Sequence, residues 1–171
     1  MLFILDTDVV SNLSKQQPNP ALLTWLDSVP TESLRIPMSV CFEMILGIES
    51  LRVNGHHDRA TELDQWLTGL LSNFESQIDH PDLPILKLQA QMFLTPALRN
   101  FLQTQTKSSK LKIGGDLIVA ATAVIREATV VSFNVSDYQT IHKHFPLPGL
   151  YHPGRDEWLI GNPPTSEHDV K

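Results

Sequence analysis

Residues 2–5 (LFIL) form an unbroken apolar run that ends at Asp6, and this run constrains the fold more than any other feature of the sequence. Four consecutive apolar residues without polar alternation are typical of a short strand that is buried on both faces. Such strands lie in the middle of parallel sheets, where helices cover both sides. We therefore expect residues 2–5 to form a central parallel strand, with Asp6 at its carboxyl end.

Strand-like and helix-like segments alternate along the rest of the chain. Further strands are expected at residues 34–38 and 129–133, and helices at residues 20–26, 39–51, 58–74, 88–103 with a break at Pro96, and 116–125. This alternation predicts an α/β fold of three layers, in which helices flank a mostly parallel central sheet. From Pro146 onward Pro, Gly and charge dominate, so we expect the last ~20 residues to form a loose C-terminal tail.

Composition narrows the class of protein. The 171 residues suffice for one domain, and 42% hydrophobic with 19% charged residues exclude a disordered chain or a coiled coil. The one cysteine, Cys41, excludes an internal disulfide framework. With no evident signal peptide and no apolar run of ~20 residues, we expect a soluble cytoplasmic protein. The net charge of −6 argues against nucleic-acid binding through overall charge, although a cation site would itself add acidic residues.

Four acidic residues stand where the expected fold would bring separate elements together. Asp6 and Asp137 follow expected strands, and Glu43 and Asp116 lie near expected helix starts. Two carboxylates about 4 Å apart repel by roughly 4 kcal/mol at an effective dielectric near 20, so a folded cluster needs a cation or shared protons. Oxygen ligands without Cys or His favour Mg²⁺ or Mn²⁺, and these ions promote phosphodiester hydrolysis. Each carboxylate also has a structural interpretation, as a turn residue or as a favourable charge at a helix start.

The order of four motifs resembles the PIN-domain ribonucleases, specifically VapC-type toxins. The matching segments are residues 5–13 (LDTDVVSNL), Ser39-Val40 with residues 43–48 (EMILGI), residues 116–123 (DLIVAATA) and residues 132–138 (SFNVSDY). The resemblance covers residues 1–150 as a PIN-like nuclease domain and leaves residues 151–171 as a C-terminal tail. Ser132-Phe133 stands where Thr-Arg is usual in the family.

The resemblance implies a Mg²⁺- or Mn²⁺-dependent endoribonuclease that is paired with a small antitoxin protein and commonly forms a homodimer. Its matched positions imply metal-binding and catalytic roles for Asp6, Glu43 and Asp116, completed by Asp137 directly or through water. The supporting residues that it implies are Thr7, Ser11, Ser132 and Asn134. Apart from the resemblance, the cluster of Lys107, Lys110 and Lys112 suggests a patch that steers RNA phosphates, with an ordinary solvated loop as the alternative.

Two other functions fit parts of the sequence. In a haloacid-dehalogenase-like phosphatase, Asp6 would attack phosphorus and Asp8 would act as acid and base. That family needs a lysine and an acidic pair after the serine strand, whereas Asp116 precedes it. The second alternative is a catalytically degenerate PIN-like module whose carboxylates serve only as a docking surface. Intact Asp6, Glu43 and Asp116 weigh against it.

Overall fold

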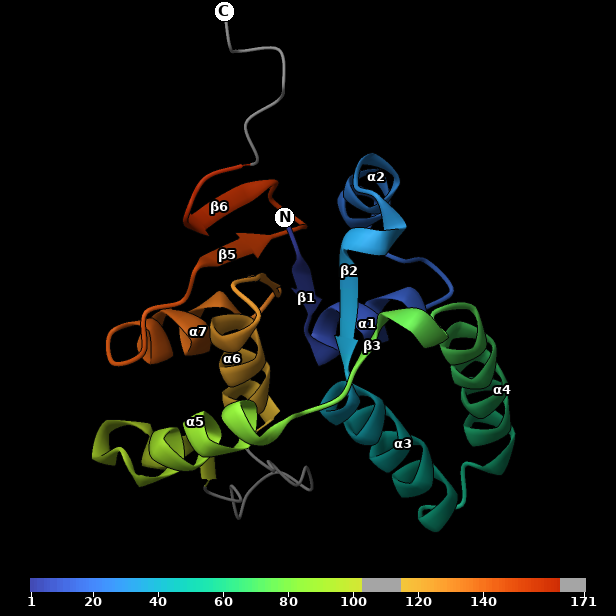
Figure 1. The fold of residues 1–171 in the computed structure, drawn as a ribbon. Coiled ribbons are helices and arrows are strands. Elements are labelled where there is room, and N and C mark those ends of the chain that lie inside the picture. The colour runs from blue at the N-terminus through green and yellow to red at the C-terminus, as the bar shows by residue number, and fades with distance from the viewer. Residues whose placement is uncertain (103–114, 164–171) are drawn as a thin grey trace, which may run out of the picture.

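The structure, a computed structural model, describes residues 1–102 and 115–163 and places a six-stranded sheet at the centre of the molecule (Figure 1). The strand order is β3-β2-β1-β4-β5-β6. The strands are β1 (Phe3–Leu5), β2 (Leu34–Pro37), β3 (Ile78–Asp79), β4 (Thr129–Val131), β5 (Gly149–His152) and β6 (Glu157–Ile160). All pairings are parallel except that of β5 with β6. This confirms the predicted α/β fold with a mostly parallel sheet.

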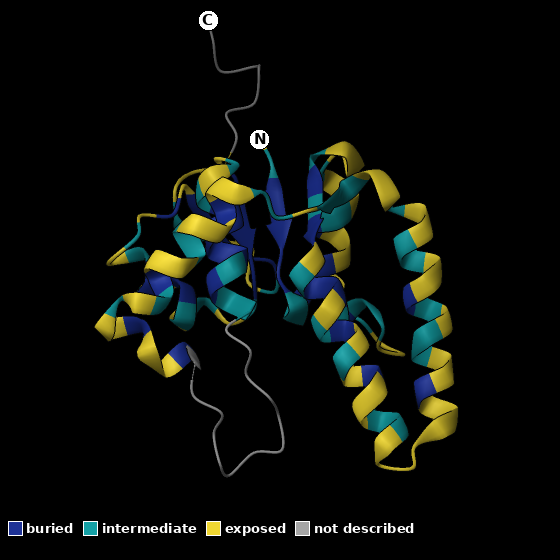
Figure 2. Ribbon diagram, turned by 60° about the horizontal axis from the view of Figure 1, so that its bottom comes forward, coloured by how far each residue is buried: buried dark blue, intermediate teal, exposed yellow. Residues whose placement is uncertain are grey.

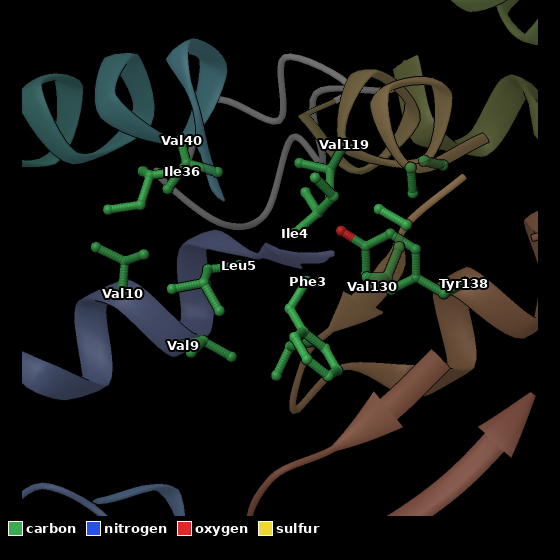
Figure 3. Close-up of a cluster of buried hydrophobic side chains, with 14 of the residues drawn as sticks. Phe3, Ile4, Leu5, Val9, Val10, Ile36, Val40, Val119, Val130 and Tyr138 are labelled. Carbon is green, nitrogen blue, oxygen red and sulfur yellow. The ribbon is translucent and has the colours of Figure 1, made fainter. Parts of the chain in front are cut away.

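Strand β1 lies in the middle of the sheet, as the apolar run at residues 2–5 predicts. Phe3 aligns with Leu34 of β2 on one side and with Thr129 of β4 on the other. Its side chains alternate between the two faces (Figure 3), where Ile4 lies on the side of Val119 and Phe3 on the opposite side. Because both faces of β1 are covered, every residue of the strand is buried.

Helices cover the sheet on both faces (Figures 1 and 2). They are α1 (Thr7–Leu13), α2 (Pro20–Ser28), α3 (Met38–Val53), α4 (His57–Asn73), α5 (Leu83–Leu94), α6 (Gly115–Ile125) and α7 (Val135–His142), with short 3₁₀ helices at Thr31–Ser33, Glu75–Gln77 and Pro96–Leu102. Helix α5 ends at Leu94 and a 3₁₀ helix begins at Pro96, which confirms the predicted break. In the described ranges 1–102 and 115–163, no helix combines the length and apolar character that a membrane crossing requires.

The expectation of a loose tail after Pro146 is wrong for residues 149–160. These residues form β5 and β6, and β5 pairs in parallel with β4. Aromatic packing explains why: Tyr151 and Trp158 lie 5.3 Å apart between ring centroids, and Trp158 lies 6.3 Å from Phe3 of the central strand. The Pro- and Gly-rich composition signalled the turns around these strands but not the aromatic contacts that hold them. Residues 164–171 lie outside the described residues, and the extent of the nuclease-like unit stays a prediction.

Candidate functional site

Asp6 lies at the carboxyl end of β1, where this strand meets β4. Its backbone N–H donates to the Val131 carbonyl over 3.0 Å, so this main-chain hydrogen bond places Asp6 beside the carboxyl end of β4. Asp6 also begins α1, because its Oδ1 accepts a hydrogen bond of 2.7 Å from the Thr7 backbone N–H. Its Oδ2 accepts one of 2.7 Å from the Ser132 hydroxyl. The side chain is thus held from two elements by neutral donors.

The environment of Asp6 disfavours a negative charge. The residue is only 4% exposed. Burial, the charge of Asp8 and the charge of Asp116, in that order, raise the pKa of Asp6 from 3.8 to about 8. The hydrogen bonds from Ser132 and Thr7 oppose this rise but do not cancel it. Asp6 and Asp116 therefore belong to one cluster, although 110 positions separate them in the sequence.

Asp8 has a position that sequence reasoning missed, since it was considered only as the acid and base of a phosphatase. Its carboxylate accepts hydrogen bonds from the backbone N–H groups of Phe133, at 3.0 Å, and Asn134, at 2.9 Å. Burial raises the pKa of Asp8, and these hydrogen bonds lower it in part. Through these hydrogen bonds Asp8 links the loop after β4 to the start of α1. The signal in the sequence was the spacing in Asp6-Thr7-Asp8, but its partners lie about 125 residues away.

Glu43 connects three helices at the same edge. The Thr7 hydroxyl donates to its Oε2 over 2.5 Å, which joins α3 to the start of α1. On the other side Glu43 lies against Gly115, the first residue of α6: a Cβ atom at position 115 would lie 1.8 Å from Glu43 Oε1. A larger residue there would push the carboxylate away. Gly115 thus lets α6 begin directly beside Glu43 and so brings Asp116, the next residue, to the cluster.

The remaining predicted residues differ in whether their hydrogen bonds reach the carboxylates of this cluster. Asp137 accepts a hydrogen bond of 2.6 Å from the Asn134 side-chain amide, at the start of α7. The Ser11 hydroxyl donates to the Asp8 carbonyl over 3.1 Å within α1. Ser132, by contrast, reaches Asp6 directly. Lys107, Lys110 and Lys112 lie outside the described residues, so their role in steering RNA stays a prediction.

The chemistry of the donor set suits a hard divalent cation. The side chains that gather here offer carboxylate and hydroxyl oxygens, which Mg²⁺ and Mn²⁺ prefer, and burial together with the charges of Asp8 and Asp116 raises the pKa of Asp6. Within residues 1–102 and 115–163, however, no three His, Cys, Asp or Glu side chains are placed to enclose a metal ion as they stand. Glu43 is turned to Thr7, and Asp8 to the loop after β4. The carboxylates would have to draw inward around an ion.

Known proteins are similar to this chain in sequence, although no family model matches it. It is 26% identical over 141 residues to VapC ribonuclease Y4jK of Sinorhizobium fredii (strain NBRC 101917 / NGR234), across 81% of this chain and 91% of the relative. It is 28% identical over 142 residues to Toxin FitB of Neisseria gonorrhoeae (strain ATCC 700825 / FA 1090), across 80% and 91%.

Solved structures of toxin–antitoxin proteins have the same fold. FitAcB from Neisseria gonorrhoeae superimposes with a TM-score of 0.66 at 24% identity, covering 89% of this chain and 98% of that one. VapBC2 from Rickettsia felis, bound to a DNA fragment from its promoter, has a TM-score of 0.57 at 14% identity, covering 81% and 92%. By sequence and by fold, the chain is similar to the VapC and FitB toxins, as its four PIN-domain-like motifs predict.

Proposed function

We propose that this chain is a metal-dependent endoribonuclease, the toxin of a VapBC-type pair, and that it acts in the cytoplasm. The single observation that carries the proposal is the meeting of Asp6, Glu43 and Asp116 at the carboxyl edge of the sheet, in a chain similar to a VapC ribonuclease. Ligands of parallel α/β sheets bind at this edge. The three carboxylates are the ligands that we assign to one or two Mg²⁺ or Mn²⁺ ions.

The chain's own residues prepare the site for hydrolysis of an RNA phosphodiester. Asp6 is held by the Thr7 backbone and by the Ser132 hydroxyl, so its oxygens keep fixed directions. Asp137, oriented by Asn134, would complete the site directly or through water. When bound, the divalent ion would lower the pKa of water and neutralise charge that develops on the phosphate and the leaving oxygen.

A small antitoxin is the protein partner that we propose. The neighbours FitAcB and VapBC2 are toxin–antitoxin proteins, and similarity to them supports such a partner here. An apolar cavity of about 210 Å³ lies where α1, α2 and α4 face the sheet; its lining includes Val10, Leu26 and Phe74. An apolar side chain of the antitoxin would fill this cavity, beside the helix that begins at Asp6.

A homodimer is the second assembly that we propose. Met38, Phe42 and Ile45 are exposed apolar residues at positions i, i+4 and i+7 of α3, so they share one face of that helix. Burial of this face against a second copy would remove apolar surface from water. Sedimentation of the wild-type chain and of Phe42→Asp would test this assembly.

The alternative functions make different demands on the site. In the phosphatase alternative Asp8 must transfer protons to the substrate, but its carboxylate is already engaged by two backbone N–H groups of the loop after β4. This geometry disfavours the phosphatase. A degenerate binding module differs from the nuclease in activity only, so an assay distinguishes them.

Cleavage of RNA by the purified chain tests the proposed function. We expect cleavage with Mg²⁺ or Mn²⁺ and none with EDTA. Asp116→Ala should lower the rate by about 1,000-fold or more, because loss of a metal ligand removes several kcal/mol of transition-state stabilisation. Asp58→Ala, which removes an equal charge from the exposed start of α4, is the matched control and should cleave normally. Metal-dependent cleavage by Asp116→Ala at a rate near that of the wild type would refute the site, and absence of cleavage by the wild type would favour the binding module.

A further inference from the structure

The Tyr138 hydroxyl is a buried polar group without a hydrogen-bond partner. Tyr138 lies on α7 and is fully buried, and its hydroxyl has no partner within the residues that the structure describes. Figure 3 shows its ring beside Val130, with the oxygen pointing away from α7 and into the molecule. Buried hydroxyls in folded proteins are nearly always hydrogen-bonded, so an unpartnered one calls for a physical explanation. The apolar packing around the ring would be equally well satisfied by phenylalanine.

The surroundings of this hydroxyl are the carboxylates of the candidate site. After burial, the charges of Asp6 and Asp116 contribute most to raising the pKa of Tyr138 well above its ordinary value. A side-chain hydrogen bond with Asp6 also contributes to raising the pKa of Tyr138, although the two groups fall short of full hydrogen-bond geometry in this structure. The Tyr138 hydroxyl therefore has a neighbouring carboxylate, that of Asp6, which can accept a hydrogen bond that is not fully formed here.

Asp6 has room for a further donor. Its Oδ1 already accepts from the Thr7 backbone and its Oδ2 from Ser132, but each carboxylate oxygen can accept two hydrogen bonds. A hydrogen bond to a carboxylate that is held ionised is shorter and stronger than one to a neutral group. A bound cation would hold Asp6 ionised, so the Asp6–Tyr138 hydrogen bond gains most when the site is loaded.

We propose that Tyr138 is a positioning residue whose hydroxyl donates a hydrogen bond to the Asp6 carboxylate when a divalent cation is bound. This inference rests on the proposed metal-dependent function and adds a residue from α7 to the support of Asp6. The hydroxyl then orients a metal ligand without touching the ion or the RNA. Outer hydrogen-bond partners of this kind fix the direction of ligand side chains and strengthen metal binding.

Tyr151 provides a matched control, because it is the chain's only other tyrosine and is also buried. Its hydroxyl donates to Asp156 Oδ1 over 2.8 Å, so this hydrogen bond is already formed without metal. Tyr151→Phe should lower the metal-free melting temperature and leave Mn²⁺ affinity unchanged. Tyr138→Phe should do the reverse: the metal-free melting temperature stays the same or rises, and Mn²⁺ binds roughly tenfold more weakly.

The experiment is a calorimetric Mn²⁺ titration of the full-length wild type, Tyr138→Phe and Tyr151→Phe, together with metal-free melting curves. Tenfold weaker binding by Tyr138→Phe alone supports the proposal. Equal affinity of Tyr138→Phe and the wild type overturns it, as does equal weakening by Tyr151→Phe. A fall in the metal-free melting temperature of Tyr138→Phe as large as that of Tyr151→Phe also overturns it, because the hydroxyl would then be structural. A wild type that binds no Mn²⁺ refutes this inference and the proposed metal-dependent function together, whereas binding without RNA cleavage refutes only the function.

Discussion

The two ends of α6 gather carboxylates in opposite ways. At its start, Asp116 acts on the buried Asp6, whose hydrogen bonds come from a backbone N–H and a hydroxyl. Just beyond its end, Arg126 binds both oxygens of Asp79, at 3.0 and 3.1 Å, and one oxygen of Asp82, at 2.7 Å. In the first group a buried carboxylate lies near like charges, and in the second two carboxylates share one arginine.

The pKa values follow this difference. At the Arg126 end, hydrogen bonds with the two aspartates raise the pKa of the guanidinium, and the same contact lowers the pKa of Asp82. At the Asp116 end, burial and like charges raise the pKa of Asp6 to about 8. Acidic residues alone do not mark a functional site; a carboxylate whose pKa is raised by burial and by neighbouring carboxylates does so much more specifically.

The largest expected effect is the pH dependence of metal-free stability. The folded chain holds the Asp6 proton up to about pH 8, whereas the unfolded chain loses it near pH 4. Because the unfolded state binds fewer protons in this window, the free energy of unfolding falls as pH rises from 4 to 8. We expect the melting temperature in EDTA to drop by on the order of 10 °C between pH 5 and pH 8.5.

Asp6→Asn tests the origin of this slope. The substitution keeps the side-chain volume but removes the titrating group, so the melting temperature should depend less on pH. The Arg126 end contributes no slope in this range, since the lowered pKa of Asp82 matters only when the solution becomes more acidic than about pH 4. An unchanged pH dependence of the melting temperature in Asp6→Asn would mean that another group causes it.

Addition of Mn²⁺ should reverse the instability at the Asp116 end. At a concentration 100 times its Kd, a ligand that binds only the folded state stabilises it by about 2.7 kcal/mol. Differential scanning fluorimetry at pH 7.5 should show a rise of several degrees that is absent in Asp6→Asn. Asp82→Asn, altered at the other end of α6, should keep the full rise. An equal rise in both variants would mean that Mn²⁺ binds elsewhere.

Removal of the counterion at the other end should destabilise the chain. In Arg126→Ala the side chain of Asp79, only 9% exposed, loses its partner. We expect a loss of about 2 kcal/mol, less than for a fully buried pair because the Arg126 side chain is 29% exposed. Chemical denaturation measures this loss in the free energy of unfolding. Arg59→Ala breaks an exposed pair with Glu62 and should change stability little; similar losses in the two variants would remove the distinction.

The smallest expected effect concerns Ser132, whose hydroxyl supports Asp6. Ser132→Ala removes one donor from a carboxylate that keeps its backbone hydrogen bond, so RNA cleavage should fall by roughly fivefold, equivalent to about 1 kcal/mol. Ser72→Ala, on the exposed surface of α4, controls for loss of a hydroxyl. Cleavage at the wild-type rate in Ser132→Ala would show that the Thr7 backbone alone orients Asp6.

Local patterns in the sequence were sufficient for much of the fold. The apolar run at residues 2–5 predicted the central strand, and Phe3, Ile4 and Leu5 are all buried because both faces of β1 are covered. Asn19 before Pro20 determined the start of α2, since its side chain accepts from the Ala21 and Leu22 N–H groups. These features depend on neighbours within a few residues, which the sequence displays directly.

The candidate site shows where that information ends. Motif order brought Asp6, Glu43 and Asp116 into one prediction. It did not predict the hydrogen bonds between Asp8 and the loop after β4. Nor did it predict the close contact of Gly115 with Glu43 or the unpartnered Tyr138 hydroxyl. The strands formed by residues 149–160 were missed for the same reason. Each of these features depends on contacts between atoms brought together only when the sheet assembles, and no short-range pattern encodes which distant side chain will be the partner. The sequence by itself determined the acidic positions, the central strand and most of the helices, whereas the tertiary structure decided which of those groups face one another, because only the assembled sheet brings distant side chains into contact.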